Sequence, residues 1–210
     1  MSAVSETIVR EYFELCGFLV RQHRKYIAQT RREEDDIDFF VLNPLAQKRA
    51  AQQPFVLASE DLDFIGRAIV VVKGWHTETF SSARLASTPE IFRFVGTKVF
   101  QQAAKVFGEN GAPLKILVIP ALPQSAQARE ESIALLRAKG VDAVIPFRSM
   151  LADLIARTET NRNYQKSDLL QVIRILKNYD FFKEQQMELF KPKRRKFGLT
   201  PHAGPTKTGE

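Results

Sequence analysis

The chain has 210 residues, a length that suits one domain with a sizeable core, and 44% of them are hydrophobic, including 16 phenylalanines. This composition excludes a disordered chain and predicts a packed globule. The formal net charge is +7, but six basic residues and one acid between Lys191 and Glu210 carry +5 of it, which leaves +2 for residues 1–190. Charge alone therefore does not make the body of the protein a strongly basic nucleic-acid binder.

The sequence favours a cytoplasmic protein without a membrane partner. The sequence shows no basic segment followed by an apolar run of the kind found in signal peptides, and no apolar run approaches the length of a membrane span. The single cysteine, Cys16, falls in an apolar helical stripe, where core packing is favoured over a reactive thiol. The three histidines and this cysteine lack zinc-site spacing, and the sequence contains no phosphate-binding glycine loop.

A helix and three strands are expected in the first half of the chain. Apolar residues at helical spacing follow Ser5, which suits a helix cap, and Gly17 marks the helix end. The third strand is an almost unbroken β-branched run, which indicates burial on both faces. The ranges expected after the helix are strands at 18–26 and 37–42, a short strand at 55–57, a helical turn at 59–64 and a strand at 68–73.

Helices and strands alternate in the second half. Thr88, Pro89 and Glu90 form a helix start, with a cap, a proline in the first turn and an acid, and Gly108 ends this helix. A strand, helix, strand order then predicts parallel strands joined by right-handed crossovers. The expected ranges are a strand at 115–119, a helix at 126–139, a strand at 142–147, a short helix at 149–157 and a long final helix from 168 to about 190.

Together these elements predict an α/β fold with a mixed central sheet of about five strands flanked by helices. A single domain is expected over residues 1–190, followed by a basic, disordered tail at 191–210 that is rich in Gly, Pro and Thr near its end. A different α/β fold stays open, in which residues 115–147 form a Rossmann-like crossover unit, although no phosphate-binding glycines support it.

Two charged residues stand in the apolar strand runs: Asp38 in the second strand and Lys73 at the end of the third. A charge in such a run is costly to bury without a partner or a task. If the two strands are neighbours, Asp38 and Lys73 meet at one end of the sheet. A carboxylate there can hold Mg²⁺, and a lysine can stabilise charge on a phosphate. Strict alternation places Asp38 on the face of Phe40 and Lys73 on the face of Val71.

This order of elements, with an Asp in the second strand and a terminal Lys in the third, resembles the PD-(D/E)XK nuclease superfamily over residues 5 to about 147. The resemblance implies a restriction-endonuclease-like fold and metal-dependent cleavage of nucleic acid. In that family two carboxylates and the backbone carbonyl between acid and lysine bind the metal. Asp38 then matches the first acid, Lys73 the lysine and Val72 the carbonyl. Val71 replaces the second acid, so the motif matches at two residues of three.

An acid from elsewhere in the chain would have to replace the missing carboxylate if Mg²⁺ or Mn²⁺ is to bind. The family sometimes uses a first-helix acid, and Glu11, at the border of the apolar face of the first helix, is the first choice. Glu6 lies on the other border, Glu14 faces away, and Glu78 could fold back from the segment that follows Lys73. A solvated helix face also explains the three helix acids.

Basic and hydrogen-bonding residues indicate a candidate nucleic-acid surface. The first strand ends in a basic cluster, a histidine follows the third strand, and the next helix carries a polar side at three- and four-residue steps. Solvated faces and an ordinary strand-end histidine explain the same residues. The candidate contacts are Arg21, Arg24, Lys25, His76, Lys98 and Lys105, with residues 191–196 as a phosphate-seeking arm.

The sequence thus predicts a nucleic-acid-binding PD-(D/E)XK-like protein, with DNA favoured over RNA, whose metal-dependent nuclease site is rearranged or degenerate. The candidate catalytic residues are Asp38, Lys73 and Glu11, and the candidate metal ligands are Asp38, Glu11 and the Val72 carbonyl. The alternative is a non-catalytic interaction module on the same scaffold, in which Asp38 and Lys73 form only a buried ion pair. The sequence does not set the oligomeric state.

Overall fold

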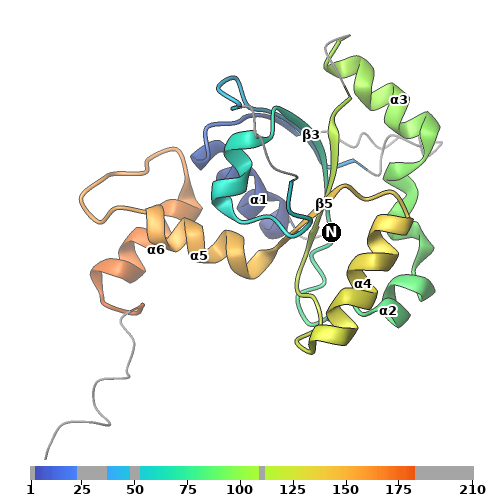
Figure 1. Cartoon of the computed structure of the whole chain (residues 1–210). Coiled ribbons are helices and arrows are strands. Elements are labelled where there is room, and N and C mark those ends of the chain that lie inside the picture. The colour runs from blue at the N-terminus through green and yellow to red at the C-terminus, as the bar shows by residue number, and fades with distance from the viewer. Residues whose placement is uncertain (1–2, 23–36, 48–52, 109–111, 183–210) are drawn as a thin grey trace, which may run out of the picture.

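The computed structural model describes residues 3–22, 37–47, 53–108 and 112–182, which form an α/β fold with a mixed five-stranded sheet flanked by helices (Figure 1). The strands lie side by side in chain order: β1 (Leu19–Gln22), β2 (Phe39–Leu42), β3 (Arg67–Val72), β4 (Leu114–Ile119) and β5 (Ala143–Pro146). β1, β2 and β3 pair antiparallel, whereas β3, β4 and β5 pair parallel. The expected fold class is confirmed, including the parallel strands of the second half.

Helices cover both faces of the sheet (Figure 1). One layer contains α1 (Ala3–Leu15), α5 (Phe147–Arg157) and α6 (Asp168–Asn178), and the other contains α2 (Ser82–Ser87), α3 (Thr97–Val106) and α4 (Ala126–Ala138). Two 3-10 helices, η2 (Ser59–Phe64) and η3 (Pro89–Val95), occur in the connections. Alternate side chains of β3 divide between two apolar clusters, with Val70 and Val72 on the α1 side and Ile69 and Val71 on the other. β3 is therefore buried on both faces, as its sequence predicts.

The first helix packs on the sheet through Ile8, Val9, Tyr12 and Phe13, which recur at helical spacing. Gly17, just past its end, has a φ of +84°, a conformation that glycine adopts without strain. Ser5, expected as the cap, instead lies within the first turn because the helix already includes Ala3.

The segment from 82 to 108 differs from the single helix expected after Thr88. α2 is an additional helix, whose cap Ser81 accepts the Arg84 N–H at 3.2 Å. The Thr88 side chain does not cap η3, because its Oγ1 donates to the Arg84 carbonyl at 2.9 Å. Gly96, with a ψ of 139°, leaves the helical conformation and separates η3 from α3.

The last helix ends at Asn178 rather than continuing to residue 190. Asp180 has a φ of +61°, and the Phe181 N–H bonds back to the Leu176 carbonyl at 3.0 Å, so the chain turns away from the helix axis. The domain boundary expected at residue 190 and the tail at 191–210 lie outside the described residues. In the part of the chain that the structure describes, no helix is long and apolar enough to cross a membrane.

Candidate functional site

The candidate site lies where Asp38 precedes β2 and Lys73 follows β3. The antiparallel register pairs Phe39 with Val70, so the start of β2 and the end of β3 meet at the same end of the sheet. The Lys73 N–H bonds to the Val118 carbonyl at 2.9 Å, which keeps this half-buried residue in the β3–β4 ladder. The fold thus brings the strand acid and the strand lysine to one end of neighbouring strands.

The regular ladder between β2 and β3 ends at Asp38, the residue before β2. Its N–H bonds to the Val70 carbonyl at 3.1 Å, although Val70 is the register partner of Phe39. Ile37 and Phe40 consequently pack in the same apolar cluster despite their odd spacing. The strict alternation that would put Asp38 on the face of Phe40 therefore does not hold through this segment.

The Asp38 carboxylate satisfies a buried backbone donor. Asp38 is 2% exposed, and its Oδ2 accepts the Val72 N–H at 2.7 Å, just where β2 stops pairing with β3. A carboxylate acceptor makes this a charge-assisted hydrogen bond, which is stronger than one between neutral groups. Because a strand residue directs its N–H and its C=O to the same neighbour, the Val72 carbonyl points to the same side. Asp38 therefore has a structural role in addition to any role in binding a metal.

Val71 stands where the resemblance to the PD-(D/E)XK superfamily would require a second acid. It is 1% exposed and packs with Phe40, Ile69 and other side chains of the cluster under α2 and α4. Such a position offers no oxygen ligand to Mg²⁺ or Mn²⁺. Across the described ranges, no three or more His, Cys, Asp or Glu side chains gather in a way that could hold a metal ion.

The direction of α1 places Glu11 away from this end of the sheet. Ser5 bonds to His76, beyond the end of β3, whereas Tyr12 bonds to Ser59 of η2, before β3 begins. The helix therefore runs antiparallel to β3, and Glu11 lies about 9 Å further along it than Ser5, at 1.5 Å per residue. The buried Glu11 carboxylate accepts from Arg10 Nη2 at 3.3 Å.

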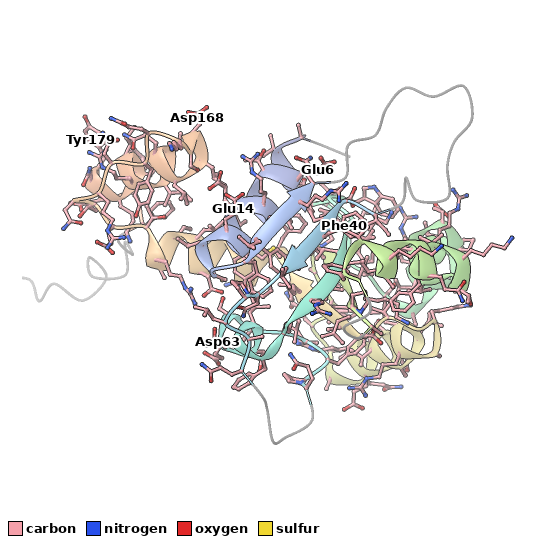
Figure 2. All side chains as sticks on the ribbon, turned by 90° about the horizontal axis from the view of Figure 1, so that it is seen from above. Glu6, Glu14, Phe40, Asp63, Asp168 and Tyr179 are labelled. Carbon is pink, nitrogen blue, oxygen red and sulfur yellow. The ribbon has the colours of Figure 1, made fainter. Side chains whose placement is uncertain are left out.

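Glu6 is the first-helix acid whose hydrogen bond lies at the Asp38 end of the sheet. Its Oε2 accepts from Gln22 Nε2 at 2.7 Å, and Gln22 is the register partner of Phe39, the residue after Asp38. Figure 2 shows Glu6 and Phe40 on neighbouring parts of the molecule, with Glu14 further along α1. The sequence pattern put Glu6 on a border of the apolar face, but only the packing of α1 beside β1 distinguishes it from Glu11.

The other acids considered as replacements are directed elsewhere. Glu14 is exposed on α1. Glu78 lies within 3.4 Å of Arg84 Nε, and the Arg84 guanidinium stands over the Trp75 ring at 5.3 Å. Trp75 in turn stacks on Phe80 at 5.8 Å. These contacts hold Glu78 in a surface cluster with α2.

His76 and Ser5 join α1 to the end of β3. The Ser5 Oγ and His76 Nε2 are 2.9 Å apart, and the His76 ring meets the Phe147 ring edge-on at 4.6 Å. Ser5 is fully buried, whereas His76 is exposed. A Cβ on Gly74 would lie 2.4 Å from the Ser5 Oγ, so the close approach of helix and strand end requires glycine there. His76 is thus anchored beside Lys73 with one ring nitrogen engaged.

The basic candidates that the structure describes are exposed. Arg21 lies opposite Phe40 on β1, and Phe107, just after α3, contacts the Phe40 ring at 6.0 Å. Lys98 and Lys105 are seven residues apart on α3, which places both on one side of that helix. Arg24, Lys25 and residues 191–196 lie outside the described residues.

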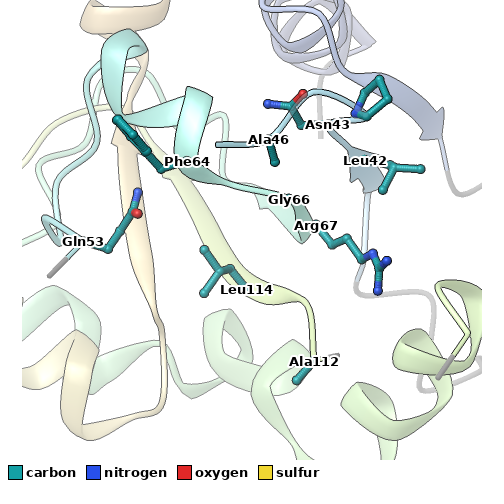
Figure 3. Close-up of a pocket in the computed structure, with 10 residues that line it drawn as sticks. Leu42, Asn43, Ala46, Gln53, Phe64, Gly66, Arg67, Ala112 and Leu114 are labelled. Carbon is teal, nitrogen blue, oxygen red and sulfur yellow. The ribbon is translucent and has the colours of Figure 1, made fainter. Parts of the chain in front are cut away.

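A pocket of about 560 Å³ opens at the opposite end of the sheet (Figure 3). Leu42, at the end of β2, and Arg67, at the start of β3, line it, with Phe64 and Leu114 on other walls. Because β2 and β3 are antiparallel, this end is the one away from Asp38 and Lys73. The pocket is therefore not part of the candidate site.

Comparisons with protein-family models, with curated proteins and with solved structures found no match for this chain. A functional proposal accordingly rests on its own residues and their arrangement.

Proposed function

We propose that this chain is a DNA-binding protein on a PD-(D/E)XK-like, restriction-endonuclease-like scaffold, with a degenerate nuclease site. The observation that carries the proposal is the position of Asp38, Lys73 and the Val72 carbonyl at one end of β2 and β3. The order of a helix, three strands, a helical segment and a further strand, on which the resemblance rests, also supports the proposal. A cytoplasmic location belongs to the same proposal.

Binding comes from positive charge around a rigid strand end. Lys73 extends from a buried strand, and His76 and Arg21 are exposed on the neighbouring segments. Such side chains contact phosphate oxygens, which gives affinity that depends on salt and little on base sequence. Lys105 is exposed on α3, close in sequence to Phe107, which contacts Phe40 of β2, and adds positive charge near this strand.

Catalysis is weakened because Val71 removes one of the two strand carboxylates. Mg²⁺ is usually held by one or two carboxylates together with substrate phosphates and water. Asp38 and the Val72 carbonyl would supply two ligands, and Glu6 is better placed than Glu11 to supply a third. We therefore expect DNA to bind without efficient metal-dependent cleavage.

Fluorescence anisotropy with labelled duplex DNA, single-stranded DNA and RNA tests the binding. Lys73→Gln should weaken duplex binding by about 10-fold. It should also reduce the slope of log affinity against log salt concentration by about one, the loss of one phosphate contact. Lys139→Gln removes one exposed charge at the end of α4 and should leave affinity within about twofold. Absence of wild-type binding at about 50 mM salt, or equal losses in the two variants, would refute the proposal.

Cleavage in Mg²⁺ or Mn²⁺ tests the degenerate site. Asp38→Asn retains an oxygen that can accept the Val72 N–H but removes the negative charge that a metal requires. Wild type and Asp38→Asn should leave duplex DNA intact to the same extent. Cleavage by the wild type at least ten times faster than by Asp38→Asn would instead make the site an active nuclease centre.

A further inference from the structure

The last described helix exposes an apolar surface at the margin of the molecule. Val172 and Ile175 lie on one side of α6, Tyr179 follows four residues later at its C-cap, and Phe181 and Phe182 are exposed in the turn after the helix. Their exposed fractions run from 40% to 74%. Figure 2 shows Asp168 and Tyr179 at the two ends of α6, on the side of the molecule away from α3. These five apolar residues are called the α6 face below.

The opposite side of α6 is fixed to the protein. Leu170 and Ile173 are 6% exposed and belong to the core cluster. Lys177 Nζ donates to the Ile155 and Thr158 carbonyls at 2.8 and 2.7 Å, which ties α6 to the end of α5. Val172 and Ile175 therefore point outward from a firmly held helix, and a group of exposed apolar side chains of this kind marks an interaction site.

We propose that the α6 face binds a second copy of this chain in an antiparallel helix pair. Phe and Tyr side chains each bury about 150–250 Å². At the exposed fractions above, full burial of all five side chains removes on the order of 500 Å² of accessible surface per chain. Two copies then bury about 1,000 Å², the lower limit of area for a biological interface, which suits a weak dimer that forms only at micromolar concentration. An isologous interface of this kind requires only one self-complementary surface, which the α6 face supplies.

The register follows from the spacing of the stripe. With the two-fold axis beside Ile175, each Val172 lies opposite Tyr179 of the other copy, so both ends of the stripe are covered. The two basic side chains of α6 do not oppose this pairing, because Arg174 Nε donates to the Thr160 carbonyl at 3.1 Å and Lys177 is held by α5. Like charges therefore do not meet at the centre of the pair. This inference is independent of the proposed function.

Sedimentation velocity of the full chain, from about 1 to 200 µM, tests the association. The wild type should shift from monomer to twice that mass as concentration rises, whereas Ile175→Glu should stay monomeric throughout, because it places two like charges at the axis. Leu45→Glu is the matched control, since Leu45 is 84% exposed outside the α6 face, and it should behave as wild type. A circular dichroism melt confirms that each variant is folded. A monomeric wild type at 200 µM, or an Ile175→Glu dimer, overturns the proposal.

Cysteine cross-linking in a Cys16→Ala background tests the antiparallel register. Ile175→Cys should form a disulfide with its own counterpart, because the residue lies next to the two-fold axis. Val172→Cys and Tyr179→Cys should link to each other in a mixture at least ten times faster than either links to itself. Efficient self-linking at Val172→Cys would mean a parallel pair and would overturn the proposed geometry.

Discussion

Replacing Asp38 by alanine should destabilise the fold by about 2–3 kcal/mol. The substitution removes a charge-assisted hydrogen bond of 2.7 Å and leaves the buried Val72 N–H without this acceptor. A hydrogen bond to a charged group contributes about 1.5–3 kcal/mol, and a buried donor left without an acceptor costs about 1–3 kcal/mol. These two figures describe the same loss, so they are not summed. For a domain of this size the melting temperature should fall by about 5–10 °C. Asp38→Asn keeps an oxygen acceptor and should cost only about 1 kcal/mol.

Urea unfolding followed by circular dichroism and by tryptophan fluorescence measures this difference. Trp75 is the single tryptophan and stacks on Phe80 close to the end of β3, so its emission reports on the affected region. The two signals should give the same midpoint for each variant if unfolding is two-state. A value for Asp38→Ala within about 0.5 kcal/mol of the wild type would refute the structural role, as would an equal cost for alanine and asparagine.

Gly74→Ala should cost about 1–3 kcal/mol in urea, because its Cβ would meet the Ser5 Oγ at 2.4 Å and force α1 away from the strand end; an unchanged midpoint would contradict that contact. Lys177→Met should cost about 1.5–3 kcal/mol by removing the donor to the Ile155 and Thr158 carbonyls, while Arg174→Met, at an exposed bond, should cost under about 1 kcal/mol. Burial raises the pKa of the Cys16 thiol from 9.0 to about 11, so at pH 8 iodoacetamide should modify it roughly 100-fold more slowly in the folded chain than in urea. Because the folded pKa is the higher one, the corresponding stability should be present below pH 9 and disappear as the pH rises to about 11.

The sheet follows from sequence patterns that have a direct physical cause. The apolar run of β3 requires cover on both faces, and the alternation of strand and helix in the second half requires parallel pairing. Both features are confirmed in the structure. Where the predicted helices differ from the structure, the difference arises at a single residue with a non-helical backbone conformation. Gly96 turns out of the helix and Asp180 adopts a positive φ, and neither dihedral angle can be inferred from apolar spacing alone.

The candidate site shows a different limit of sequence reasoning. The pairing of β2 with β3 follows from chain order, but the irregular backbone at Asp38 does not, because its N–H bonds to the carbonyl of Val70, the register partner of Phe39. Glu6 and Glu11 occupy opposite borders of one apolar helix face, so periodicity ranks them equally. The docking of α1, with Glu6 beside β1 and Glu11 towards the start of β3, distinguishes them.

The Asp38→Asn variant distinguishes a structural role of Asp38 from a role as a metal ligand. As a structural group, Asp38 needs only an oxygen that accepts the Val72 N–H, which an amide provides. As a metal ligand it needs negative charge, which an amide lacks. If Lys73 binds phosphate without a metal, loss of a nearby negative charge should strengthen DNA binding, by about twofold to tenfold at low salt, while stability falls little. If a bound metal instead bridges Asp38 and DNA, the same variant should bind less tightly in Mg²⁺ and show no such loss in EDTA. Measuring affinity in both conditions, with Lys73→Gln alongside, therefore distinguishes a phosphate-binding lysine from a metal-dependent site.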